Sequence, residues 1–226
     1  MIRFENVHKR YPNGREALSG VSFSLDRGEM AFLTGPSGAG KSTLLKLIAL
    51  IERPTRGTVL VNNLNTARVP RRRIPRFRQR IGVVFQDHKL LYDRSVFDNV
   101  ALPLIIGGLK PREIGRRVRA ALDQVGLLDR ETHAPITLST GEQQRIGIAR
   151  AVASRPDVVI ADEPTGNLDP ELSLEIMRLF ERFNDVGVTL LIATHDLELV
   201  DHLNHRRLKL VAGQIAADSK QASDAA

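Results

Sequence analysis

Three glycines and a lysine lie between two apolar runs near the start of the chain. The stretch GPSGAGKST, residues 35–43, follows MAFLT and precedes LLKLIAL. Gly35, Gly40, Lys41 and Ser42 match the phosphate-binding loop pattern G-x-x-x-x-G-K-[ST]. Glycines let consecutive backbone N–H groups curl around an anion at the positive end of the following helix. We predict that Lys41 reaches the β- and γ-phosphates of a nucleotide and that Ser42 binds Mg²⁺. The alternative is a glycine-rich turn that happens to precede a helix.

Four polar residues follow apolar runs that are typical of buried parallel strands. Gln86 ends IGVVFQ, the pair Asp162 and Glu163 ends DVVIADE, and His195 follows VTLLIAT. In an open α/β sheet, ligand-binding groups collect beyond the carboxyl ends of the strands. We therefore expect these side chains to converge on the phosphate held by the loop.

Each of these residues has a chemical use and a simpler alternative. Asp162 would hold Mg²⁺ through water, or would cap the next element. Glu163 would accept a proton from the attacking water, or would form a structural salt bridge. Gln86 can donate and accept, so it would contact the γ-phosphate, the metal or the water, or would be a turn residue. His195 would hydrogen-bond the γ-phosphate and orient the water, or would be a surface residue.

Composition favours a folded globular protein in a reducing compartment. The 226 residues are 42% hydrophobic, enough to build a core, and there is no Cys. No apolar run approaches the roughly 20 residues that cross a bilayer, and MIRFENVHKRY lacks the apolar region of a signal peptide. We expect the chain to remain in the cytoplasm.

Positive charge is concentrated in ARVPRRRIPRFRQR, residues 67–80, which holds seven arginines and no acid. Such a segment could bind nucleic acid, could face a membrane or an acidic partner, or could be a solvated loop. Aromatic residues that stack on bases are scarce, because Phe77 is the only one in the segment.

The elements that must position these residues follow from periodicity and turn signals. The first 34 residues predict strands of an antiparallel sheet, with PNG as a turn. Spacing of apolar residues predicts a helical insertion at about residues 90–150. The other expected elements are helices at 41–51 and 170–187 and strands at 57–63, 81–85, 157–163 and 188–196.

One long stretch decides the family resemblance. LSTGEQQRIGIARAVASRPDVVIADEPTGNLD, residues 138–169, closely resembles the signature motif, Walker B motif and D-loop of the ATP-binding-cassette (ABC) ATPases. The resemblance implies an α/β phosphate-loop NTPase core with an N-terminal antiparallel β subdomain and a helical insertion subdomain. It implies one domain over residues 1–215, and we expect the small, polar tail at 216–226 to be disordered.

The resemblance also carries site residues onto matching positions. Tyr11 matches the aromatic residue that stacks on adenine, although a plain strand aromatic is the alternative; Gln86 matches the Q-loop and His195 the switch histidine. The remaining ATP-binding positions are Gly35, Pro36, Ser37, Gly38, Ala39, Gly40, Lys41, Ser42, Thr43, Ser139, Gly141, Glu142 and Asp169. Thr140 departs from the glycine of the family pattern, which would strain the backbone if its φ were positive.

Ser139 and Gly141 form a second anion-binding turn, while the chain has one phosphate loop. The resemblance therefore implies an ATP-dependent, head-to-tail homodimer. In that dimer Ser139 and Gly141 of one copy contact the γ-phosphate held by Lys41 of the other.

FQDHKLLYDRSVFDNVALPL favours the cell-division members of the family over relatives that drive lipoprotein release or macrolide export. This resemblance implies hydrolysis of ATP to ADP and phosphate and regulation of cell-wall hydrolases. It implies an integral membrane partner contacted through residues 87–110, other possible division partners, and a peripheral location at the cytoplasmic face of the bacterial inner membrane. A nucleic-acid-associated cassette ATPase would use long coiled coils or tandem cassettes, and a phosphate-loop kinase has no use for LSTGEQQR, so no specific nucleic acid is expected.

Overall fold

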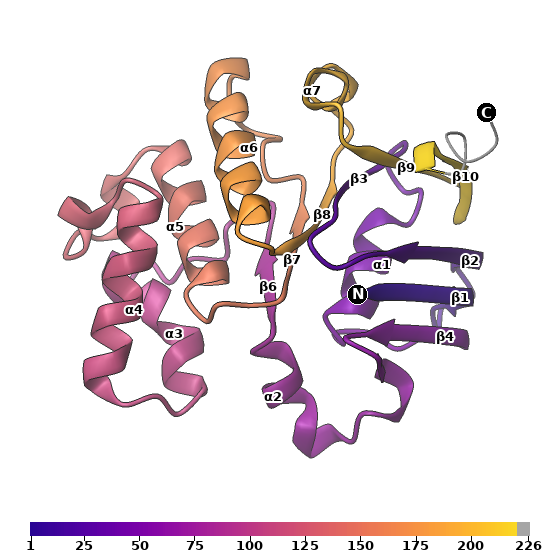
Figure 1. Cartoon of the computed structure of the whole chain (residues 1–226), viewed down its shortest axis with the longest axis horizontal. Helices are drawn as coiled ribbons and strands as arrows, with labels where there is room; N and C mark the ends of the chain where they lie inside the picture. Colours follow the sequence, from indigo (N-terminus) through magenta and orange to yellow (C-terminus); the bar gives the residue numbers. More distant parts are fainter. Residues whose placement is uncertain (221–226) are drawn as a thin grey trace.

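The computed structural model describes residues 1–220, which form two sheets and the helices around them (Figure 1). The N-terminal sheet is antiparallel with the order β2-β1-β4-β5. Its strands are β1 (Ile2–Arg10), β2 (Glu16–Leu25), β4 (Arg56–Val61) and β5 (Leu64–Asn65). Buried and exposed residues alternate along β2, as expected for a sheet with one face toward the core.

The second sheet has the order β10-β9-β3-β8-β7-β6, and all its neighbours are parallel except the pair β9 and β10. Its strands are β3 (Met30–Thr34), β6 (Ile81–Val84), β7 (Val158–Asp162), β8 (Thr189–Ala193), β9 (Arg206–Val211) and β10 (Gln214–Asp218). Residues of β3 and β8 are buried throughout because both faces of the sheet are covered. Phe32 packs into the core on one face and Leu33 into the core on the other.

Helix α1 (Lys41–Ile48) lies between the two sheets, and its apolar residues join the same core as β1 and β7 (Figure 1). Helix α6 (Pro170–Asp185) covers the opposite face of the parallel sheet with Ile176 and Phe180. Helix α7 (Leu197–Leu203) follows β8. This arrangement places the start of α1 at the carboxyl edge of the sheet, where β3 ends.

Three helices form the end of the molecule farthest from the antiparallel sheet (Figure 1). They are α3 (Val96–Ile106), α4 (Pro111–Gln124) and α5 (Thr140–Val152), with 3-10 turns at Leu128–Arg130 and Pro135–Thr137. Val118, Ala121 and Leu122 of α4 are buried, as their helical spacing predicts. In the described part of the chain, no helix has the length and apolar character to cross a bilayer.

The arginine-rich segment contains two 3-10 turns, Thr66–Arg68 and Arg71–Arg73, and the short helix α2 (Ile74–Arg78). Its first part is held by Arg53, whose guanidinium donates to the carbonyls of Ala67 (2.5 Å) and Val69 (2.7 Å). The segment therefore has a defined path even though it is short of apolar residues.

The disordered tail predicted from residue 216 is wrong at its start, because β10 continues to Asp218. The Asp218 carboxylate accepts from Arg206 on β9 at 2.7 Å, and Arg206 also pairs with Glu29 at 2.7 Å. These ion pairs attach the last strand to the sheet. Residues 221–226 of the predicted tail lie outside the described residues.

Candidate functional site

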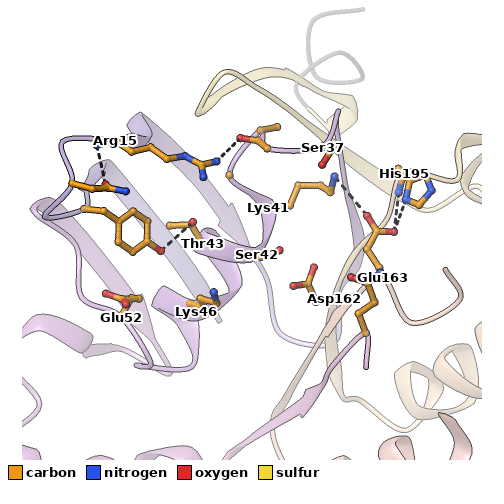
Figure 2. Close-up of a pocket in the computed structure, with 16 residues that line it drawn as sticks. Arg15, Ser37, Lys41, Ser42, Thr43, Lys46, Glu52, Asp162, Glu163 and His195 are labelled. Carbon is orange, nitrogen blue, oxygen red and sulfur yellow. Dashed lines mark hydrogen bonds and ion pairs between the residues drawn. The ribbon is translucent and has the colours of Figure 1, made fainter. Parts of the chain in front are cut away.

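A cavity of about 730 Å³ opens where α1 begins, and residues from distant parts of the sequence meet in it (Figure 2). The phosphate loop, the antiparallel sheet and the ends of β6, β7 and β8 all contribute. Twelve of the predicted site residues line it: Tyr11, Ser37, Gly38, Ala39, Gly40, Lys41, Ser42, Thr43, Gln86, Asp162, Glu163 and His195. The expected convergence at the carboxyl edge of the sheet is therefore present.

The loop before α1 has a conformation that requires glycine. Gly35 has a φ of 145° and Gly40 a φ of 110°. A Cβ would lie 2.0 Å from the Leu210 carbonyl oxygen at Gly35 and 2.5 Å from the Ala17 carbonyl oxygen at Gly40, distances that no side chain tolerates. Because the backbone is packed this closely, the loop presents its N–H groups at the start of α1, the arrangement that binds phosphate.

Lys41, Glu163 and His195 form a connected chain of polar groups (Figure 2). The Lys41 ammonium donates to the carbonyls of Gly35 (2.7 Å) and Pro36 (3.4 Å), and its Nζ lies 3.6 Å from Glu163 Oε1. Glu163 Oε2 is 2.8 Å from His195 Nδ1 and accepts from the His195 backbone N–H at 3.2 Å. The Lys41 and Glu163 side chains are only 8% and 12% exposed, so their mutual attraction is weakly screened by water.

Glu163 has a backbone conformation that is rare for a residue with a side chain. Its φ is 48°, which costs on the order of 1 kcal/mol in a residue other than glycine. The hydrogen bonds from Glu163 N–H to the Ala193 carbonyl (2.9 Å) and from Gly166 N–H to the Glu163 carbonyl (3.2 Å) hold it there. This turn directs the carboxylate back across the end of the sheet toward Lys41.

Asp162, the last residue of β7, is the preceding carboxylate. Burial raises the pKa of Asp162, and the neighbouring Glu163 charge acts in the same direction, whereas a hydrogen bond from Ser42 and the charge of Lys41 oppose the rise. The carboxylate, the Ser42 hydroxyl and the Gln86 amide oxygen are hard oxygen donors of residues that line the cavity, the type of ligand that Mg²⁺ prefers. A bound cation would favour the charged form of Asp162 that burial disfavours.

Gln86 follows β6 and begins a tightly held loop. His88 and Lys89, two and three residues after Gln86, have left-handed φ angles of 56° and 49°. Arg150 of α5 donates to the carbonyls of both, at 2.5 Å and 2.7 Å. The His88 side chain is buried, which lowers the pKa of its imidazole.

At the other side of the cavity, the Tyr11 hydroxyl is 3.3 Å from Thr43 Oγ1, and the Lys9 ammonium lies 4.9 Å from the centre of the Tyr11 ring. Four lining residues were not predicted: Asn13, Arg15, Lys46 and Glu52. Arg15 and Lys46 add two cations to Lys41 (Figure 2). Lys46 could have been found, because it lies one helical turn after Ser42 on the same face of α1.

The predicted signature and D-loop residues do not line the cavity of their own chain. Ser139 caps α5, and its hydroxyl donates to Glu142 Oε2 at 2.8 Å; the backbone and side-chain hydrogen bonds from Ser139 lower the pKa of Glu142. Thr140 is the first residue of α5 and has no positive φ, so the backbone strain that a positive φ would cause at this position is absent.

Gly141 is buried against the start of α6, where a Cβ would lie 2.4 Å from Leu172 Cδ2. Asp169 caps α6 by accepting from the Leu172 N–H at 3.0 Å. The beginnings of α5 and α6 are therefore in direct contact through Gly141 and Leu172.

Comparison with known proteins agrees with this geometry. The family model described as ABC transporter matches residues 18–166. The cell division ATP-binding protein FtsE of Escherichia coli strain K12 is 59% identical over 215 residues, which cover 95% of this chain and 97% of that protein. FtsE of Bacillus subtilis strain 168 is 46% identical over 221 residues, with 98% and 97% covered.

The chain belongs to the FtsE family of ABC ATPases.

Solved cassettes share the fold of this FtsE-family chain. A dimeric structure of the ATP-binding cassette MJ0796 in a post-hydrolysis state, bound to ADP and Pi, has a TM-score of 0.88 and 34% identity and covers 96% of this chain and 97% of that one. Another dimeric structure of MJ0796, a bacterial ABC transporter cassette, has the same TM-score and 35% identity. The predicted family, the α/β cassette fold and the ATPase activity are confirmed: this FtsE-family protein binds and hydrolyses ATP.

Proposed function

We propose that this chain is the ATP-hydrolysing subunit of a cell-division complex of the FtsEX type, in which it works beside an integral membrane partner resembling FtsX. The observation that carries the proposal is the set of polar contacts that connects Lys41, Glu163 and His195 in the cavity. The protein that contains them is 59% identical to a cell division ATP-binding protein. The four polar strand-end residues and the phosphate loop form one hydrolytic site.

Glu163 is the general base in this mechanism. It accepts a proton from the attacking water, whose oxygen bonds to the γ-phosphorus while the bond from that phosphorus to the bridging oxygen breaks, which releases ADP. Lys41 and the loop N–H groups stabilise the charge on the phosphate oxygens. His195 holds the Glu163 carboxylate through two contacts and orients the water beside the γ-phosphate.

Magnesium fits the oxygen donors that face the cavity. Ser42, Asp162 directly or through water, and Gln86 would hold it, and when bound it would neutralise charge on the β- and γ-phosphates. Tyr11 would stack on the adenine, and Arg15 and Lys46 would add positive charge beside the phosphates.

We infer that two copies associate head to tail around ATP. Ser139, Gly141, Glu142 and Asp169 lie outside their own cavity but cap or begin two adjacent helices. The dimeric MJ0796 cassettes support this association. In the dimer, Ser139 and Gly141 of one copy contact the γ-phosphate bound by the other, so ATP binding closes the dimer and hydrolysis lets it open.

The membrane partner would dock in an apolar groove next to the Gln86 loop. This groove, a cavity of about 530 Å³, lies between α2, α3, α5 and the end of β6. Ile106 on its edge is 66% exposed and neighbouring Ile105 is 55% exposed, a large apolar area for a surface without a partner. A partner docked there would hold the chain at the cytoplasmic face of the inner membrane. Each ATP cycle would then move the partner and regulate cell-wall hydrolases, and further division proteins could join the assembly.

The test of this function is Glu163→Gln, which keeps the size of the side chain but removes the base. We expect ATP binding to remain and hydrolysis to fall by about 100-fold or more, with an ATP-bound dimer accumulating in size-exclusion chromatography. Glu198→Gln, the same change on exposed α7, is the matched control and should keep the wild-type rate. Wild-type turnover in Glu163→Gln would remove Glu163 from this role.

A further inference from the structure

The net charge of the chain comes from one segment. The chain has 33 basic and 26 acidic residues, and residues 67–80 contribute seven arginines and no acid. Removing these seven arginines leaves 26 basic residues, equal to the number of acidic ones. The rest of the molecule is therefore neutral overall, and its formal charge of +7 is confined to a short surface segment.

Five of the arginines have side chains without a partner among residues 1–220. Arg78 donates to the carbonyls of Ala49 and Leu50, and Arg80 pairs with Asp157. We name the other five the arginine cluster; all are exposed, and they are Arg68, Arg71, Arg72, Arg73 and Arg76. An arginine usually pairs with a carboxylate when one is near, so five unpaired arginines within nine residues leave guanidinium groups free to bind external anions.

The cluster is held in place from beneath. Arg53 donates to the carbonyls of Ala67 and Val69, on either side of Arg68, and Phe77, the residue after Arg76, is buried in the core. Because the backbone is fixed at both ends, binding of an anionic surface would not need to order the segment first.

Burial of Phe77 also weighs against nucleic acid. It is the one aromatic residue of the segment and is only 7% exposed, so no ring is available to stack on bases. A planar array of phosphates is a better match for guanidinium groups that lie along a short turn and helix.

The position of the cluster favours a membrane. Pro75 and Arg78 of α2 line the apolar groove together with Ile106 of α3. Arg76 of the cluster lies between these two α2 residues, so the cluster lies directly beside that groove. Helices α2 and α3 both lie along the lower edge of the molecule in Figure 1. We propose that the arginine cluster binds the headgroups of anionic phospholipids and so orients the chain on the bilayer next to the groove. The inference rests on the proposed function only for the presence of a membrane at that groove.

The experiment uses the full chain without nucleotide and sedimentation with vesicles of phosphatidylcholine, with or without phosphatidylglycerol. We expect binding only to the anionic vesicles and its loss at high salt, because a membrane surface potential is screened within about 10 Å at 0.1 M salt. Each arginine near such a surface strengthens partitioning roughly fivefold, so the triple variant Arg71→Gln, Arg72→Gln, Arg73→Gln should bind on the order of 100-fold more weakly.

The matched control removes the same charge elsewhere. Arg27, Arg112 and Arg178 are exposed and lie outside the arginine-rich segment, and the triple change of these to Gln should keep most of the vesicle binding. Equal losses in the two triple variants would overturn the proposal, because net charge alone would then explain binding. Binding to neutral vesicles, no binding to anionic ones, or tighter cluster-dependent binding to duplex DNA at the same salt would also overturn it. None of these measurements depends on ATP hydrolysis, so the outcome is separate from that of Glu163→Gln.

Discussion

Asp162 and Glu163 are adjacent carboxylates with different surroundings. Asp162 ends a buried strand, and burial is the main reason for its raised pKa. Glu163 is turned by its positive φ toward the Lys41 ammonium and the His195 ring. Asp162 is therefore suited to bind a cation and Glu163 to accept a proton, so two adjacent residues have different roles.

Asp162→Asn should therefore raise the stability of the protein when Mg²⁺ and nucleotide are absent. Because the pKa of Asp162 is higher in the folded than in the unfolded state, the folded state binds the proton more tightly. The charged carboxylate thus weakens the fold above that pKa, and the weakening disappears as pH falls through it. We expect the melting temperature of the variant to exceed that of wild type at neutral pH, with a difference that shrinks on acidification.

Thermal unfolding at a series of pH values measures this difference, with Asp123→Asn on the exposed face of α4 as the control. Addition of Mg²⁺ and ATP should stabilise wild type but not Asp162→Asn. A lower melting temperature in the variant, or a difference that does not change with pH, would show that burial of the charge is unimportant.

Spacing in the sequence predicts most of this site, because the loop pattern and the strand ends fix where the side chains meet. Arg15 was not predicted because it lies in a turn of the antiparallel sheet, far from the phosphate loop in sequence. In the folded protein its guanidinium donates to the Gly38 carbonyl at 3.5 Å. The positive φ of Glu163 could not be predicted either, since it depends on a hydrogen bond to Ala193 of β8, a strand that is remote from Glu163 in the sequence.

At the scale of elements, Arg150 connects α5 to the loop after β6. Helix α5 begins with the signature residues, and near its other end Arg150 donates to two consecutive carbonyls of the loop that begins with Gln86. Arg150 also lines the apolar groove. A displacement of α5 would therefore be transmitted to Gln86 through this guanidinium.

Arg150→Lys keeps the charge but can satisfy the two carbonyls less well. We expect a loss of about 1–2 kcal/mol in the free energy of unfolding, because one carbonyl would lack its partner. We also expect kcat to fall more than the affinity for ATP, since Gln86 rather than the phosphate loop would be displaced. Urea unfolding and steady-state kinetics measure both quantities, and Arg178→Lys on α6 is the control. A kcat equal to that of wild type would show that Arg150 does not position Gln86.

Continuous apolar runs made β7 and β8 predictable, and helical spacing did the same for α4 and α6. Strands β9 and β10 were not predicted. Their residues, RRLKLV and QIAAD, are short and mixed with charges, and their turn is Ala212–Gly213 with φ angles of 47° and 77° instead of an Asn-Gly signal. Long-range pairing with β3 and the ion pairs of Arg206 stabilise them, and neither leaves a periodic pattern.

At the scale of the whole molecule, the proposed dimer divides each hydrolytic site between two copies. Mixing two inactive variants tests this division. Lys41→Ala removes the phosphate contact of the loop, and Ser139→Arg blocks the signature turn. In a head-to-tail dimer formed from one copy of each, one site carries both changes and the other carries none.

We expect an equal mixture to recover up to about a quarter of the wild-type ATPase rate, since about half of the dimers are mixed and each has one intact site. The control mixture combines Lys41→Ala with Glu163→Gln, which lie in the same cavity, so both sites of every mixed dimer stay defective. Recovery in neither mixture, or in both, would contradict the head-to-tail arrangement.

The contact between Gly141 and Leu172 constrains how this chain can evolve. A Cβ at position 141 would lie 2.4 Å from Leu172 Cδ2, so a side chain there fits only if the Leu172 side chain moves away. A lineage that acquires a side chain at position 141 must also move or shorten the side chain at position 172. These two positions should therefore covary, although thirty residues of sequence lie between them.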